Sequence, residues 1–300
     1  MNRKIFAGSL VTAATLAMTG CFSSSDFNPN EPLPGTPGAP QEQPGVRSGQ
    51  IMNNYLVGAV VCVDTNYDGQ CANEPQTIAG TKGAFSINTE NNTAPTLGIL
   101  GDDRLTAPAG AKVLSPISTL VYNRLLKKLA AGVPTNRGHI EAQDEVKNAL
   151  GFQDIDLLND DYIAQTQALV NARKLASIST TVNTILKQNR ISIKLTNLDL
   201  TAADDDALDQ VLLDEVFKKV AQVSRDVSTF VDSGQTVDTT QLANDNDIDV
   251  TVITNDLTSK LNAAKQVTEA SKQKLEALDP DSGTDGGTGG TGGTGGTGTN

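Results

Sequence analysis

Residues 112–132, KVLSPISTLVYNRLLKKLAAG, mark a change from strands to helices in this 300-residue chain. Ser115 followed by Pro116 is typical of a helix start, because serine caps free backbone amides and proline suits the first helical position. Apolar residues then recur at helical spacing before Gly132: Ile117, Leu120, Val121, Leu125 and Leu129. We therefore expect the fold to change character at about residue 112.

The two sides of this boundary predict an α+β protein. Short apolar runs at 57–63, 83–87 and 96–100 are separated by turn residues, which predicts a small β-module over residues 48–111. Helical periodicity recurs after residue 132, within 141–150, 161–189 and 249–278 and in a further helix that starts at a Thr201 cap. Residues 112–278 are therefore predicted to form a mainly α helical bundle of about five helices.

The loop between the first two strand runs carries the clearest chemistry. Residues 62–71 read CVDTNYDGQC, with side-chain oxygens at Asp64, Asn66 and Asp68 and a glycine at position 69 that permits a sharp turn. Calcium takes six to eight oxygen ligands, so these side chains and the carbonyl of Gln70 are candidate ligands. The twelfth position of an EF-hand would be Pro75, which disfavours that fold. An Asx-rich turn, whose side chains bond their own backbone, is the open alternative.

The stretch GAVVCVDTNYDGQCANEP, followed by TKGAFSI, resembles small β-sandwich modules of bacterial surface proteins, of the carboxypeptidase-regulatory-like and adhesin B-repeat kind. The resemblance implies a β-sandwich-like module with a cation loop, and it adds Glu74 as the acid that completes the site. The order of this module, the segment LSPISTLV and the helices is similar to a group of proteobacterial surface lipoproteins. That similarity implies no biochemical activity.

The N-terminus predicts an export signal over residues 1–20, with a basic start and an apolar run at 5–18. LAMTGC resembles the box that ends bacterial lipoprotein signals, which implies that Cys21 is lipidated; a plain secretory signal is the alternative. Phe22 stands where such proteins carry an aspartate for inner-membrane retention, which favours the outer membrane. After Cys21 no apolar run approaches the roughly 20 residues that a spanning helix needs. We expect the chain to be tethered to the lipid membrane through acylated Cys21.

The other two cysteines predict a disulfide. With Cys21 assigned to lipid, Cys62 and Cys71 are an even pair that flanks one loop. An exported protein resides in an oxidising compartment, where such pairs become bridged. We therefore expect the loop to be closed by a Cys62–Cys71 bond.

Charge and histidine content argue against several classes of function. The chain has 35 acidic and 23 basic side chains, and loss of Arg3 and Lys4 with the signal would leave a net charge of about −14. Nucleic acid is a poor partner for such a chain, because phosphate binding needs a basic surface. His139 is the single histidine, so histidine-dependent triads and zinc sites lack their residues. We expect no enzymatic activity.

Two segments read as disordered: a Pro, Gly and Ser-rich linker at 21–47 and a Gly/Thr-rich tail at 279–300. Two acidic clusters, 204–206 and 244–249, are explained as acids at helix starts. The sequence thus predicts an outer-membrane lipoprotein with a calcium-stabilised module that acts in surface interaction or adhesion, with a protein or other surface partner. The alternative is a periplasm-facing lipoprotein that binds a small hydrophobic ligand or serves as an accessory subunit of an envelope assembly.

Overall fold

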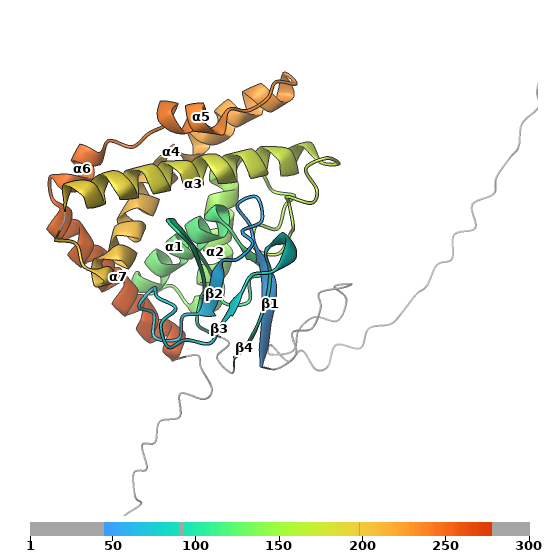
Figure 1. The fold of residues 1–300 in the computed structure, drawn as a ribbon. Helices are drawn as coiled ribbons and strands as arrows, with labels where there is room; N and C mark the ends of the chain where they lie inside the picture. Colours follow the sequence, from blue (N-terminus) through green and yellow to red (C-terminus); the bar gives the residue numbers. More distant parts are fainter. Residues whose placement is uncertain (1–44, 90–92, 198, 278–300) are drawn as a thin grey trace, which may run out of the picture. The chain divides into compact units, whose positions relative to one another are not determined.

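The computed structural model describes residues 45–89, 93–197 and 199–277 (Figure 1). Cys21, the expected signal at 1–20, the tail at 279–300 and most of the expected linker lie outside these residues. The predictions made for them stay predictions. The described residues confirm the mixed α+β class, with strands in two small sheets followed by a helical region.

The strands form one sheet of three and one of four. Their bounds are β1 Val46–Ile51, β2 Val60–Val63, β3 Gln76–Ile78, β4 Ala84–Asn88, β5 Thr96–Leu100, β6 Asp103–Ala107 and β7 Val113–Leu114, with a short 3-10 helix, η1, at Thr81–Gly83. In the first sheet, β1 pairs antiparallel with β4 and parallel with β7. In the second, every pairing is antiparallel, in the order β3-β2-β5-β6.

The two sheets meet at Gly98, in the middle of β5. A Cβ atom at this position would lie 2.4 Å from Cδ1 of Ile51 and 2.7 Å from Cδ2 of Leu114. Both of these side chains belong to the other sheet, on β1 and β7. Side chains of one sheet therefore press on the backbone of the other, and only glycine leaves room for that approach.

Helices follow the strands to the end of the described chain. The bounds are α1 Pro116–Ala130, α2 Thr135–Leu150, α3 Val170–Thr196, α4 Ala202–Asp232, α5 Thr239–Asp245, α6 Val250–Thr254 and α7 Leu257–Glu276. The start of α1 confirms the prediction from Ser115 and Pro116, because Ser115 and Ser118 form a reciprocal capping box. The long helices α3 and α4 pack against each other (Figure 1).

Several segments differ from the expectation: β7 lies within the range expected to be helical, and α2 begins at Thr135, earlier than the expected 141. The helix expected from residue 161 begins only at Val170, because the Asp161 carboxylate binds the Tyr55 hydroxyl and the Ala164 amide and so favours a turn. The helix expected over 249–278 is divided into α6 and α7 at Asp256, whose φ of −145° is not helical. The expected linker also overlaps β1, which begins at Val46.

Strands and helices share one hydrophobic core. Its main cluster contains Leu105 and Leu114 from the strands together with Leu120, Ile178 and Leu212 from the helices. The strands and helices of the described residues accordingly belong to one compact unit. None of the helices in the described ranges has the length and apolar character needed to span a membrane.

Candidate functional site

A disulfide between Cys62 and Cys71 closes the loop after β2, as predicted. The two Cα atoms are 5.5 Å apart, and both sulfurs pack with Leu97 in a small apolar cluster separate from the main core. The hydrogen bonds of this loop extend to Glu74, so we call residues 62–74 the closed loop.

The candidate ligands of the closed loop accept hydrogen bonds from its own backbone. The Asp64 carboxylate accepts from the amides of Asp68 at 3.1 Å and Gly69 at 3.0 Å. Oδ1 of Asn66 accepts from the Asp68 amide at 2.9 Å, and Oδ1 of Asp68 accepts from the Gln70 amide at 2.7 Å. Gly69 has a φ of +69°, which permits this tight path.

Glu74 folds back onto the same turn. Its Oε1 accepts from the Asn66 amide at 3.2 Å, and its Oε2 accepts from the Thr65 hydroxyl. Glu74 and Asp64 are 8% and 5% exposed, so both acids are withdrawn from water. The structure therefore brings Asp64, Asn66, Asp68 and Glu74 into one turn, and Gln70 contributes its backbone amide.

These bonds match the Asx-rich turn that the sequence left open. Within the described ranges, no three His, Cys, Asp or Glu side chains are arranged as a metal-binding group. A carboxylate or amide oxygen has two acceptor positions, so one hydrogen bond leaves the second available to a cation. Calcium at this loop stays a prediction.

Burial and mutual repulsion change the acidity of the site. Burial raises the pKa of Asp64 to about 7; the Gly69 amide opposes this shift, and the charges of Asp206, Asp68 and Glu74 add to it. Burial also raises the pKa of Asp206, although the Arg104 charge opposes the shift. Asp64 in the closed loop and Asp206 beside it are thus costly to ionise where they are buried.

The closed loop contacts α4 through Arg104 of β6. The Arg104 guanidinium donates to the Gly69 carbonyl and also pairs with Asp209 of α4, with Nε 3.2 Å from Oδ2. Asp206 lies beside the same glycine: a Cβ on Gly69 would be 2.9 Å from Oδ1 of Asp206. Asp209 is held in turn by Arg190 of α3, whose Nε donates to Oδ1 at 2.6 Å.

A second contact joins the closed loop to α7. The Lys272 ammonium donates to the Asn66 carbonyl at 3.0 Å and lies 5.9 Å from the centroid of the Tyr67 ring. Tyr67 is 7% exposed and belongs to the main hydrophobic core. Tyr67 is therefore inserted into the core, while Asn66 binds Lys272 of α7 and Gly69 binds Arg104 of β6.

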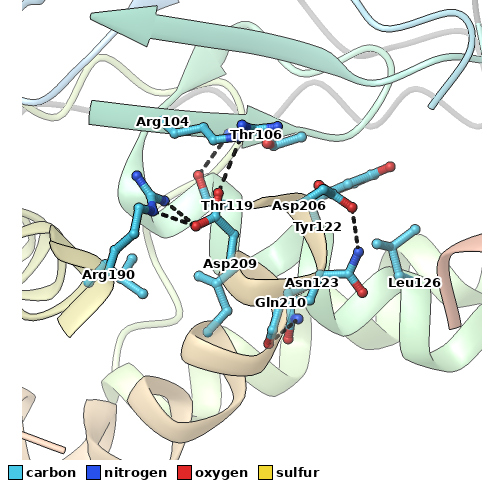
Figure 2. Close-up of a pocket in the computed structure, with 12 residues that line it drawn as sticks. Arg104, Thr106, Thr119, Tyr122, Asn123, Leu126, Arg190, Asp206, Asp209 and Gln210 are labelled. Atoms are coloured by element: carbon cyan, nitrogen blue, oxygen red, sulfur yellow. Dashed lines mark hydrogen bonds and ion pairs between the residues drawn. The ribbon is translucent and has the colours of Figure 1, made fainter. Parts of the chain in front are cut away.

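A small cavity lies where β6, α1, α3 and α4 meet (Figure 2). Its volume of about 20 Å³ is room for about one water molecule. Figure 2 shows Arg104 and Arg190 directed at Asp209, and Gln210 directed at Asp206. The charged side chains around the cavity bind one another, and these ion pairs hold β6, α3 and α4 together.

Sequence reasoning missed Arg104, Asp206 and Lys272 as neighbours of the loop. We expected the whole 204–206 cluster to serve the start of its helix, and Asp204 does form a capping box with Thr201. Asp206 instead lies against the loop glycine, so that interpretation was wrong for this residue. No signal in the sequence connects residue 206 to residue 69, because the contact depends on tertiary packing.

No family model, curated protein or solved structure matches this chain. The resemblance of the loop to bacterial surface modules therefore stays a prediction.

Proposed function

We propose that the chain is an outer-membrane lipoprotein that acts in cell-surface interaction or adhesion, and that calcium stabilises its strand region through the closed loop. The observation that carries the calcium proposal is the meeting of Asp64, Asn66 and Asp68, within the disulfide-closed ring, with Glu74, which folds back onto the same turn. In this view the strands form a β-sandwich-like module and the helices form a bundle. No enzymatic activity is proposed.

Electrostatics supports a cation at the loop. Asp64 is buried among other acids, which raises its pKa to about 7. A divalent cation would offset this repulsion and favour the ionised form. Calcium fits the chemistry of the loop best, because it prefers carboxylate, amide and backbone carbonyl oxygens and tolerates irregular geometry. The Gln70 carbonyl is the proposed further ligand.

The acidic surface favours a basic partner. The whole chain carries a formal net charge of −12 at pH 7. Such a charge attracts cations and positively charged surfaces and repels nucleic acid. We therefore propose a protein or surface partner with a basic contact region.

Replacement of Cys21 by Ser tests the anchor. Two or more acyl chains hold a protein stably on a bilayer. We expect Cys21→Ser to move the protein from the membrane fraction to the soluble fraction, measured by immunoblot after cell fractionation. A variant that stays in the membrane through a detergent-free salt wash would refute the lipoprotein proposal.

Protease shaving of intact cells tests the surface role. Residues 22–44 should provide accessible cleavage sites if the tether is on the cell exterior. We expect shaving to release the compact unit from wild-type cells, while a periplasmic marker protein stays intact. Full protection of the chain in intact cells, with cleavage after the outer membrane is permeabilised, would contradict the surface role and favour the periplasmic alternative.

A further inference from the structure

The closed loop contacts three parts of the molecule that are distant in sequence. Through Gly69 it meets Arg104 of β6 and Asp206 of α4, and through Asn66 it meets Lys272 of α7. Tyr67, between these contacts, is buried in the main core. These contacts are noncovalent, and the Cys62–Cys71 bond, the disulfide found in the described residues, lies within the closed loop itself.

We propose that the closed loop is a redox-sensitive latch. While the Cys62–Cys71 bond is intact, the loop holds the first turns of α4 and the last turns of α7 against the strands. Reduction of the bond by a dithiol releases these two helical segments and leaves the rest of the helical region packed. The latch does not require bound calcium and is separate from the function proposed above.

The contacts explain why the disulfide matters to the helices. Arg104 binds the Gly69 carbonyl and the Asp209 carboxylate at the same time, which requires the carbonyl to stay in its present position. Gly69 lies within the ring that the disulfide closes. The same ring contains the carbonyl of Asn66 that Lys272 binds. When the disulfide is reduced, the loop has many more backbone conformations. Forming the Gly69–Arg104 and Asn66–Lys272 contacts then costs more conformational entropy.

The reduction step has a defined course. Cys71 is 8% exposed and Cys62 is fully buried, so the attacking thiolate of the dithiol meets Sγ of Cys71 first. A mixed disulfide forms at Cys71, and Cys62 leaves as a thiolate that takes up a proton. The second thiol of the reductant then displaces Cys71. The protein gains two electrons and two protons, and the dithiol becomes a disulfide.

Hydrogen exchange of the full chain, read by mass spectrometry in the presence of a calcium chelator, tests the latch. We expect dithiothreitol to raise exchange at least tenfold in residues 204–212 of α4 and 265–276 of α7, and to leave α2 and α5 unchanged. A variant with both Cys62→Ser and Cys71→Ser should show the fast exchange from the start and no response to the reductant. Exchange that rises only within the closed loop would overturn the proposal, as would a rise throughout the molecule.

Arg104→Met tests the same connection with the disulfide intact. We expect α4 to exchange faster than in wild type before reduction and to respond little to dithiothreitol afterwards. The response of α7 should persist, because Lys272 binds Asn66 independently of Arg104. Arg137→Met, which removes an exposed ion pair with Glu141 on α2, is the matched control and should behave as wild type. Unchanged exchange of α4 in the Arg104 variant would overturn the latch.

Discussion

The chain has two acidic stretches of similar composition, and they have opposite surroundings. The closed loop places Asp64 and Glu74 out of water, with the Asp206 carboxylate close to Asp64. Residues 244–249, NDNDID, were expected to serve a helix start; Asn244 and Asp245 instead end α5, so that interpretation was wrong for them. Asp249 is exposed and caps α6 by accepting from the Thr251 amide at 3.0 Å. Alternating acids and amides therefore do not by themselves define a candidate cation site. In the closed loop, Gly69, the disulfide and the packing of α4 distinguish the site from the exposed stretch.

The pKa shifts express this difference. Burial raises the pKa of Asp64 to about 7. Hydrogen bonds from the side chain and backbone of Thr251 lower the pKa of Asp249. A carboxylate with a raised pKa weakens the fold when it ionises, and one with a lowered pKa weakens the fold when it takes up a proton. The two stretches should thus respond to pH in opposite directions.

The largest effect should be a loss of stability at rising pH that depends on Asp64. In chelator, the folded state keeps the Asp64 proton up to about pH 7, whereas the unfolded chain loses it near the ordinary aspartate pKa of 3.8. Stability from this group is present below about pH 4 and falls as pH rises to about 7, by at most about 4 kcal/mol. Urea unfolding between pH 4 and 8 measures the change.

Asp64→Asn is the matched variant for this experiment. The Asp68 and Gly69 amides donate to different oxygens of Asp64, so asparagine keeps an acceptor for one of them and removes the ionisable group. The variant is therefore compared by the slope of its stability with pH, not by its absolute stability. We expect its stability to decline less than that of wild type between pH 4 and 7, because the Asp64 contribution is removed while Asp206, whose pKa is also raised by burial, still responds in the same direction. An equal decline in both proteins would assign the pH dependence to other groups and contradict the burial argument.

Calcium should have the next largest effect. If the closed loop binds calcium only when folded, calcium at a hundredfold its dissociation constant adds about 2.7 kcal/mol of stability. Because strands and helices share one core, we expect a single calorimetric transition that shifts as a whole. A scan in calcium and a scan in chelator give the size of the shift.

The two acidic stretches provide the controls for calcium. Asp68→Ala should abolish the shift, because it removes a proposed ligand from the closed loop. Asp247→Ala should keep the shift, because Asp247 lies before α6 and accepts from the Asn189 side chain at 2.6 Å. If wild type melts identically in calcium and chelator, the closed loop is an Asx-rich turn and the calcium proposal fails.

Local signals in the sequence predicted much of this molecule. Ser115 and Pro116 marked the start of α1, Gly151 follows α2 in a left-handed conformation, and residues 96–100 were correctly predicted as β5. The disulfide followed from an even pair of cysteines beside one loop. Each of these features depends on residues that are close together in the chain.

Features set by distant residues were not predicted. β1, β3, β6 and β7 went unrecognised, because pairing with other strands stabilises such short segments more than their own sequence does. The same holds for Asp206, whose position beside Gly69 depends on how α4 packs against the closed loop. The start of α3 was misplaced because Asp161 binds Tyr55, 106 residues away in sequence.

The smallest effect should come from the cap of α6. Asp249→Ala removes the acceptor for the Thr251 amide, so we expect a loss of stability smaller than the calcium effect, measured by urea unfolding at pH 7. Asp249→Asn is the matched control, because asparagine caps a helix about as well as aspartate and carries no charge. We expect the Asn variant to keep most of the stability that the Ala variant loses. An equal loss in both would show that charge, rather than the capping hydrogen bond, makes Asp249 favourable there, and would weaken the contrast with the closed loop.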